Sequence, residues 1–479
     1  MGENKTPLDF TTFHNVINGE IAKTGGKTRQ IVNPSTLQKN PELPLSSLED
    51  VNLAVSSAQK AAASWAAVPW DKRADALGQL ADAIEANTAE FVKLVTMEQG
   101  KPPMWAQLEI ATVVQWLRGF CKLSLAGETI ENSDERKVVT RYTPLGVAVG
   151  IAPWNFSVQL GCIKLASAIL TGNAFIWKPS PHAPYCALKM AELGSRFFPP
   201  GVLQALSGDD ELGVWLTQHP GVDMVSFTGS TRVGKLVMES CSKTMKRFTL
   251  ELGGNDAAIV CADVDAATVA AKIGVIAWCN SGQICISVKR IYVHESVYDA
   301  FLAALVGFAQ SLKLGADGDA FLGPLSNQFQ YERVKELLAD IEENKYGIAT
   351  GSTKPLSDKP GYFLAPTVVD NPPDHARIVA EEQFGPVIPV LKWSDESDVI
   401  QRANAGPAGL GASVWSRDIA QADRMGKQLQ AGNIWINCHA EMQPSTPFSG
   451  QKESGLGTEM GVDGLKAYCN IQSIYTRPA

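Results

Sequence analysis

The chain has 479 residues, and at about 150 residues per domain this length predicts two to four packing units. Its 45% hydrophobic and 19% charged residues are typical of a folded globular protein and argue against general disorder or a fibrous repeat. Acidic residues outnumber basic ones by 50 to 42, a net charge of -8, so we do not expect the clustered positive face that binds nucleic acid.

The nine cysteines are scattered and contain no Cys-x-x-Cys spacing, which disfavours a disulfide framework and a zinc site. We therefore expect free thiols in a reducing, cytoplasmic compartment and no metal. The N-terminal residues lack the apolar core of a signal peptide, and the most apolar stretch, residues 145–177, is interrupted by Pro153, Asn155 and Lys164. Neither a targeting segment nor a membrane span is expected.

Apolar β-branched runs alternate with Ala/Leu-rich stretches of helical period, which predicts an α/β fold. In chain order the expected elements are helices in 51–68 and 74–95, strands at 146–152, 173–177 and 223–227, then strands at 256–262, 290–294, 366–370 and 386–393 with helices at 266–280 and 296–312. Strands without polar alternation suit parallel sheets covered by helices on both faces. We expect two doubly wound, parallel-sheet lobes that meet between the regions of Glu251 and Cys285.

Two further segments, 137–147 and 470–478, look like isolated strands at the margins of the fold. Because an exposed edge strand usually finds a partner, we expect them to join a sheet between subunits. The Gly/Pro-rich residues 346–361 are predicted to form a surface loop.

Three residues are candidates for catalysis. Cys285 follows a helix and a Gly-Gln break, on a turn where substrate could reach a thiol. Glu251 ends an apolar run before two glycines, where a carboxylate is either paired or tuned for proton transfer. Asn155 follows a strand that ends in proline, and its amide is a neutral donor suited to an oxyanion. An inert packed thiol, a capping glutamate and a turn-forming asparagine are the alternatives.

Other segments could hold a phosphorylated ligand. Gly229, Ser230 and Gly234 form a glycine turn that opens a helix, which suits a phosphate or is a plain turn. Lys178 directly follows an apolar strand, and Glu382 precedes a tight turn. The usual Gly-x-Gly-x-x-Gly fingerprint of dinucleotide binding is missing after the early strands.

In this order the segments resemble the aldehyde dehydrogenase superfamily, from about Asn18-Gly19 to the last strand. The shared motifs are Pro-Trp-Asn-Phe at 153–156, Lys-Pro-Ser at 178–180, Phe-Thr-Gly-Ser-Thr-x-x-Gly at 227–234, Glu-Leu-Gly-Gly at 251–254, Gly-Gln-x-Cys at 282–285 and Glu-Glu-x-Phe-Gly-Pro at 381–386. The separation of Glu251 and Cys285 is also similar to the family's.

The resemblance implies an enzyme that oxidises an aldehyde to the carboxylic acid with NAD or NADP. Cys285 would be the nucleophile that forms a thiohemiacetal and then a thioester, Glu251 the base that activates the hydrolytic water, and Asn155 the oxyanion donor together with the Cys285 amide. Lys178 would contact the adenosine ribose. The full set of implied cofactor-binding residues is Trp154, Lys178, Ser180, Gly229, Ser230, Gly234, Glu382 and Phe384.

The family architecture implies a Rossmann-like cofactor lobe in residues 1–127 and 147–252 and a catalytic lobe in 253–440. Residues 441–467 would connect the lobes and line the substrate tunnel. An oligomerisation arm would comprise 128–146 and 468–479, which implies a homodimer or homotetramer.

Two departures concern specificity. Pro181 stands where many NAD-specific members have an acidic residue, so we expect weaker discrimination against NADP. The positions that match the family's substrate tunnel are mostly apolar and include no arginine: Leu160, Ile163, Trp278, Ile284, Ile286, Met442 and Phe448. This favours a medium aliphatic or aromatic aldehyde. The alternatives are a cationic aminoaldehyde held by Glu441, with His439 at the same mouth, and a cysteine esterase without redox chemistry.

Overall fold

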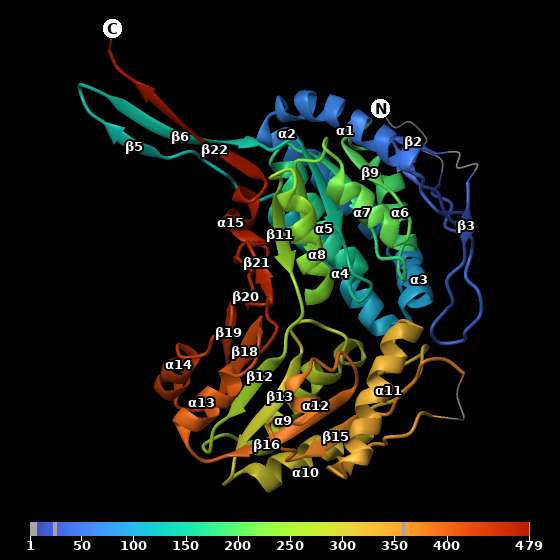
Figure 1. Cartoon of the computed structure of the whole chain (residues 1–479), viewed down its shortest axis with the longest axis vertical. Helices are drawn as coiled ribbons and strands as arrows, with labels where there is room; N and C mark the ends of the chain where they lie inside the picture. Colours follow the sequence, from blue (N-terminus) through green and yellow to red (C-terminus); the bar gives the residue numbers. More distant parts are fainter. Residues whose placement is uncertain (1–6, 23–25, 357–359, 479) are drawn as a thin grey trace.

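The computed structural model describes residues 7–22, 26–356 and 360–478. Figure 1 shows two lobes joined along one side, with a narrow arm that projects from the first lobe. Parts of three predicted regions lie outside the described residues: 1–6 and 23–25 of the first lobe, 357–359 of the loop and 479 of the arm.

The first lobe contains an eight-stranded sheet in the order β2-β1-β9-β8-β7-β10-β11-β21. Its strands are β1 (Val16–Ile17), β2 (Glu20–Ile21), β7 (Val147–Ile151), β8 (Ala174–Lys178), β9 (Leu203–Ala205), β10 (Met224–Thr228), β11 (Arg247–Glu251) and β21 (Gly455–Leu456). The five central strands, β9 to β11, are parallel, and the outer ones are antiparallel. The carboxyl ends of the parallel strands therefore share one edge, which faces the second lobe (Figure 1).

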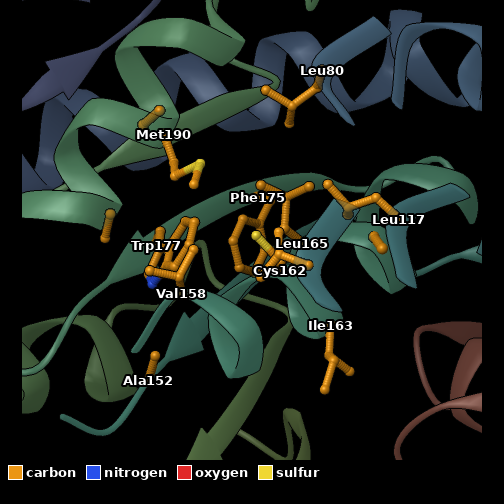
Figure 2. Close-up of a cluster of buried hydrophobic side chains, with 14 of the residues drawn as sticks. Leu80, Leu117, Ala152, Val158, Cys162, Ile163, Leu165, Phe175, Trp177 and Met190 are labelled. Carbon is orange, nitrogen blue, oxygen red and sulfur yellow. The ribbon is translucent and has the colours of Figure 1, made fainter. Parts of the chain in front are cut away.

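Helices cover both faces of this sheet because successive strand residues point to opposite sides. The flanking helices are α1 (Leu48–Ala66), α2 (Trp70–Ala86), α3 (Thr88–Gln99), α4 (Pro103–Phe120), α5 (Ser157–Leu170), α6 (Tyr185–Gly194), α7 (Asp210–Gln218) and α8 (Thr231–Ser242). One core packs α2 to α6 against Phe175 and Trp177 of β8, and Figure 2 shows part of it. The other packs α1, α7 and α8 against the opposite face, where Ile176 lies.

The second lobe contains a seven-stranded sheet in the order β14-β15-β16-β13-β12-β18-β19. Its strands are β12 (Asp256–Val260), β13 (Val288–His294), β14 (Gly347–Thr350), β15 (Thr367–Asp370), β16 (Val387–Trp393), β18 (Gly411–Trp415) and β19 (Asn433–Ile436), all parallel to their neighbours except β14. The helices are α9 (Ala266–Trp278) and α10 (Tyr298–Ser311) on one face, and α11 (Gln328–Glu343), α12 (Arg377–Ala380), α13 (Glu396–Asn404) and α14 (Ile419–Gly426) on the other. The prediction of two doubly wound parallel-sheet lobes is confirmed.

The arm is a three-stranded antiparallel sheet in the order β22-β6-β5. It consists of β5 (Thr129–Asn132), β6 (Lys137–Pro144) and β22 (Cys469–Thr476), and it extends away from both lobes (Figure 1). The two marginal strands are therefore not isolated, because they pair with each other over eight residues within one chain.

Three local predictions need correction. The helical stretch 74–95 is interrupted at Asn87, which ends α2 and begins α3 with φ -113° and ψ 18°. The predicted loop contains β14, because residues 347–350 pair with the edge of β15. Helix α9 ends at Trp278, two residues early, because the next turn is left-handed. The remaining short elements are β3 (Thr28–Arg29) with β4 (Leu43–Pro44), β17 (Ala408–Gly409) with β20 (Gln451–Lys452), and α15 (Gly461–Lys466).

Among the described residues, no helix combines the length and apolar character needed to cross a bilayer. In the same part of the chain, no cluster of three or more His, Cys, Asp or Glu side chains is arranged to hold a metal ion.

Candidate active site

Cys285 stands on a backbone turn between α9 and β13. Asn280, Ser281 and Gly282 have φ values of 50°, 57° and 74°, three consecutive residues in the left-handed region. A side chain at Gly282 would place its Cβ 2.2 Å from the carbonyl oxygen of Gly385, so glycine is required there. The turn leaves the Cys285 side chain half-buried, which agrees with a thiol that substrate can reach.

Buried hydrogen bonds fix this turn. The Asn280 amide donates to the carbonyl oxygens of Gln283 and Asn155, both at 3.2 Å. The Gln283 amide donates back to the Asn280 carbonyl at 2.9 Å, and the Lys289 ammonium donates to the Gly282 carbonyl at 2.7 Å. Non-glycine residues in the left-handed region cost about 1–3 kcal/mol each, so this conformation depends on these contacts.

Asn155 lies beside the same turn, just after β7. Its side-chain amide donates to the carbonyl oxygen of Gln283 at 2.9 Å, which leaves the second N–H of that amide for another acceptor. The side chain is buried, so this donor is held in one position. The predicted oxyanion donor thus comes from the first lobe and the nucleophile from the second.

Glu251 ends β11 on the first lobe and is 3% exposed. Neither carboxyl oxygen has a hydrogen-bond partner among the described residues. The Cys285 thiol and the Thr228 hydroxyl approach the carboxyl group and favour its charged form, although they fall short of hydrogen-bond geometry. Burial, reinforced by the negative charge of Glu459, raises the pKa of Glu251 to about 8.

Burial raises the pKa of the Cys285 thiol well above its ordinary value, and the nearby carboxylates of Glu251, Glu382 and Asp256 raise it further. Both causes favour the protonated thiol, and the carboxyl group of Glu251 lies next to it. A nucleophile next to a base of raised pKa is an arrangement typical of catalytic sites.

The predicted phosphate turn follows β10. Ser230 is the N-cap of α8, with its hydroxyl accepting from the amide of Val233 at 3.4 Å. A Cβ at Gly229 would lie 2.5 Å from the ring of Phe227, and one at Gly234 would lie 2.5 Å from Leu252. The turn therefore requires glycine for packing, and it leaves the N-terminus of a 12-residue helix open to an anion.

Lys178 is the last residue of β8 and Ser180 follows it at the same edge of the sheet, and both are buried. The one hydrogen bond found for the Lys178 ammonium among the described residues is to the carbonyl of Pro179, at 3.2 Å. Burial lowers the pKa of Lys178 to about 8, with Asp210 opposing the shift. A buried ammonium with unused N–H groups is suited to donate hydrogen bonds to hydroxyl oxygens of a ligand.

Glu382 faces the glycine pair that follows Glu251. Its carboxylate accepts from the amide of Gly254 at 3.3 Å, and a Cβ at Gly253 would lie 2.6 Å from it. Burial raises the pKa of Glu382 to about 7. The rings of Trp154 and Phe384 make an edge-to-face contact, with their centres 5.3 Å apart. Predicted cofactor-binding residues from the two lobes therefore lie next to each other.

Six of the seven predicted tunnel residues belong to a single apolar cluster that also includes Cys285: Leu160, Ile163, Ile284, Ile286, Met442 and Phe448. Trp278 does not join them. It is fully buried in the core between α9, α10 and the second sheet, where it stacks on Phe308 and donates to the carbonyl of Pro386 at 3.2 Å. Trp278 is therefore a packing residue, and its assignment to the tunnel is wrong.

Met442 also lines an open groove of about 1060 Å³ between α4 and residues 441–446. Glu441 is exposed in this groove. His439 is not at the mouth, contrary to expectation, because it is buried between the hydroxyl of Ser413 at 2.9 Å and the carbonyl of Ile286 at 3.0 Å.

Sequence reasoning missed two buried ion pairs that border the site, Lys101–Glu109 and Lys164–Glu459. The Lys164 ammonium also donates to the Thr228 hydroxyl at 2.8 Å, on the strand beside that of Glu251. The available signal was a charged residue inside an apolar helical stretch, since such a residue is buried only when it is paired.

The comparisons agree with this geometry. Residues 21–474 match the model of the aldehyde dehydrogenase family. A phenylacetaldehyde dehydrogenase of Pseudomonas fluorescens is 34% identical over 465 residues, which cover 94% of this chain and 92% of that protein. The structure of a Bacillus cereus aldehyde dehydrogenase in complex with NAD+ superposes with a TM-score of 0.93 at 34% identity, covering 97% of this chain and 96% of that one. An Escherichia coli NADP-dependent enzyme superposes with a TM-score of 0.95 at 31% identity, covering 98% and 99%. This chain therefore belongs to the aldehyde dehydrogenase family.

Proposed function

We propose that this protein oxidises an aldehyde to the carboxylic acid with NAD or NADP, using Cys285 as the nucleophile and Glu251 as the base. The observation that carries the proposal is the half-buried Cys285 thiol, which approaches the Glu251 carboxyl, a buried group whose oxygens have no hydrogen-bond partner among the described residues.

The residues present fit a nicotinamide dinucleotide. Lys178 offers a buried ammonium with unused N–H groups, and Ser230 stands at the open N-terminus of α8, a suitable place for a pyrophosphate. The Glu382 carboxylate is suited to the hydroxyls of a second ribose. The Bacillus cereus and Escherichia coli relatives, one bound to NAD+ and one described as NADP dependent, support the same cofactor class. When bound, the nicotinamide supplies the hydride acceptor for the oxidation.

The chain's own residues account for the other steps. Glu251 takes the thiol proton as the sulfur of Cys285 forms a bond with the carbonyl carbon of the aldehyde. The oxygen becomes negative, and the Asn155 amide and the backbone N–H of Cys285 stabilise it. The adduct is then oxidised to a thioester on Cys285, and Glu251 releases the thiol proton to solvent, so that it is a carboxylate again. It next takes a proton from water, whose oxygen attacks the thioester and releases the carboxylic acid and the thiolate.

The six predicted tunnel residues that share the first-lobe core cluster with Cys285 are all apolar, and this supports a medium aliphatic or aromatic aldehyde. A buried carbonyl oxygen or amide on the substrate would lack partners among Leu160, Ile163, Ile284 and Phe448, whereas a hydrocarbon would gain about 25 cal/mol for each Å² removed from water. The relative that is named for phenylacetaldehyde is consistent with this class.

Cofactor choice remains NAD or NADP within this proposal. Pro181 supplies no carboxylate beside Lys178, but the charges of Asp209 and Asp210, near the start of α7, act on the Lys178 ammonium, as does Arg29. Carboxylates near the ribose disfavour the 2′-phosphate of NADP, whereas an arginine favours it. The test therefore compares turnover with NAD and with NADP at equal concentration. Turnover with NAD alone would contradict the expectation that Pro181, in place of an acidic residue, weakens discrimination against NADP.

The test follows formation of the reduced nicotinamide with hexanal, benzaldehyde, succinic semialdehyde and an aminoaldehyde. We expect turnover with hexanal or benzaldehyde to exceed that with the other two. A preference for the aminoaldehyde would assign a role to Glu441, and a preference for succinic semialdehyde would contradict the apolar tunnel. Hydrolysis of esters without any aldehyde oxidation would identify a cysteine esterase instead.

We also propose that residues 128–146 and 468–479 form an oligomerisation arm. Its described strands project from the body and expose Ile130, Ile471 and Tyr475 at 61%, 62% and 66%. Apolar side chains on a projecting sheet are expected to be covered by another subunit. Light scattering of the full chain tests this, and a monomer would contradict it.

A further inference from the structure

We propose that Lys101 and Glu109 are positioning residues, which fix the backbone of the segment that carries Asn155, the proposed oxyanion donor. The inference rests on the proposed function, since it assigns these residues a role through Asn155. It concerns a buried charge pair that is separate from Cys285 and Glu251 and that lies on the far side of the segment linking β7 to α5.

The Lys101 side chain is fully buried, with 0% of its surface exposed. Its ammonium pairs with the Glu109 carboxylate and donates to the backbone carbonyl of Asn155 at 2.9 Å. It also lies 3.6 Å from the centre of the Phe156 ring, on whose face a cation is attracted. All three contacts of the ammonium therefore serve the segment that carries Asn155 or the carboxylate that orients it.

Glu109 holds the same segment one turn further on. Its second oxygen accepts from the amides of Val158 and Gln159, at 3.2 and 3.3 Å. These N–H groups belong to the first turn of α5, where no carbonyl of the helix itself can accept from them. The N-cap residue of α5, Phe156, provides no side-chain capping hydrogen bond. The carboxylate of a distant helix thus caps α5 and fixes where the segment 155–159 begins.

The backbone around Lys101 is shaped for this contact. Gly100 ends α3 with φ 72°, and a Cβ there would lie 2.5 Å from Pro324. This left-handed turn separates α3 from the segment that begins with Lys101, and Lys101 pairs with Glu109, eight residues further on in α4. A buried lysine and glutamate are a costly way to stabilise a core, which argues that their directed contacts are the reason for their placement.

The Asn155 carbonyl is held from both lobes. Lys101 donates to it from the first lobe, and the Asn280 amide donates to it from the Cys285 turn at 3.2 Å. With its backbone anchored at this oxygen, the Asn155 side chain keeps its bond to the carbonyl of Gln283, two residues before Cys285. A displacement of about 1 Å of such a donor can cost on the order of 100-fold in rate.

The experiment measures kcat, KM for hexanal and cofactor affinity for Lys101→Met, in the wild-type chain and in an Asn155→Ala background. We expect Lys101→Met to lower kcat by about 10-fold to 100-fold in the wild type, with KM and cofactor affinity nearly unchanged. In the Asn155→Ala background, which itself loses about 100-fold to 1000-fold, the further loss is expected to be less than about twofold. A purely structural role would give the same factor in both backgrounds.

Lys189→Met is the matched control. Lys189 is also a buried lysine paired with a glutamate, Glu192, and its ammonium lies 5.3 Å from the ring of Phe13, but it is on α6 away from Asn155. We expect this variant to lower the melting temperature and to leave kcat within about twofold. Glu109→Gln, which keeps the shape of the side chain, is measured in parallel and carries the test if Lys101→Met does not fold.

An unchanged kcat in Lys101→Met or Glu109→Gln, or equal losses in both backgrounds, would overturn the inference and leave the proposed function intact. A wild-type chain that does not oxidise any aldehyde would overturn the proposed function itself. An Asn155→Ala variant of full activity would remove the oxyanion role of Asn155, and with it this inference.

Discussion

The two sides of the candidate site are held in opposite ways. On the second lobe, the turn before Cys285 has its side-chain amides bonded: Asn280 and Gln283 donate to carbonyl groups, and the Gln283 side-chain oxygen accepts from the amide of Ser326 at 2.9 Å. On the first lobe, the Glu251 carboxyl is equally buried, yet neither of its oxygens has a hydrogen-bond partner among the described residues.

This difference separates groups that must stay in place from a group that must exchange protons. A carboxylate that accepts several hydrogen bonds has a low pKa and is a weak base. Glu251 avoids this, and its pKa of about 8 suits a base that works near neutral pH. The bonded turn, in contrast, holds the sulfur and the oxyanion donors without needing to move.

Removing the proposed nucleophile, on the side of the bonded turn, should have the largest effect on turnover. We expect Cys285→Ala to lower turnover by about 10⁴-fold or more, because no other group at the site can form the thioester. Cofactor affinity should be retained, since the residues that would contact it are untouched. Cys121→Ala, which removes another half-buried thiol on the first lobe, is the control and should keep full turnover. Aldehyde oxidation by the Cys285→Ala variant would disprove the assignment.

Glu251→Gln removes the base and keeps the shape. We expect steady-state turnover to fall by about 100-fold to 10,000-fold, because the thioester is no longer hydrolysed efficiently. Because Glu251 also takes the thiol proton in the proposed first step, formation of the thioester should slow as well. Intact-mass spectrometry of the enzyme with substrate and cofactor separates the two effects, since an acyl-enzyme accumulates only if hydrolysis is the slower step. Wild-type turnover in this variant would show that another group activates the water.

Asn280→Ala tests the hydrogen-bonded turn before Cys285. It removes two hydrogen bonds and places alanine at φ 50°, so we expect kcat to fall by about 10-fold to 100-fold. Asn280→Gly is the matched control, because glycine tolerates the left-handed conformation but also lacks the amide. If glycine restores kcat, backbone strain is responsible and the amide bonds are not.

The raised pKa of Glu251 predicts two smaller effects of pH. The ionised fraction of a group with pKa 8 rises roughly fivefold over the last pH unit below that value, and turnover should follow it. Stability should change in the opposite direction. Between 4.5 and about 8 the carboxyl is ionised in the unfolded chain but protonated in the folded one, so this group makes the free energy of unfolding fall as pH rises.

Denaturant unfolding at the two ends of that window, for the wild type and Glu251→Gln, measures the second effect. The glutamine variant should lose less stability as pH rises. Buried Glu98, whose pKa burial also raises to about 8, contributes the same trend in both proteins and therefore cancels in the comparison. Identical pH dependence in the two proteins would show that Glu251 is ionised in the folded state.

The two lobes, and the candidate site residues next to the ends of their strands, could be predicted from the sequence. Apolar strands such as β7, β8 and β12 are buried on both faces, and this leaves a plain pattern in the residues. Cys285, Glu251 and Asn155 could be found because motifs mark them, although their assembly across two lobes depends on tertiary contacts.

The errors have physical causes. Trp278 is next to the Cys285 turn in the chain, but the last turn of α9 directs it into the core of the second lobe. His439 is polar yet buried, because Ser413 and Ile286 satisfy its ring nitrogens. Lys101 and Glu109 belong to no motif that was recognised, and a separation of eight residues does not by itself indicate a buried ion pair.

The last stretch of the chain completes structures that were begun near its middle. Glu459 reaches Lys164 across 295 positions, β21 closes the sheet next to Glu251, and β22 supplies the outer strand of the arm. A ribosome must therefore have passed residue 459 before the surroundings of the base exist, and such distant pairings form slowly. Competence should appear only after these segments have been made, and chains released before them would be inert even though they contain Cys285, Glu251 and Asn155.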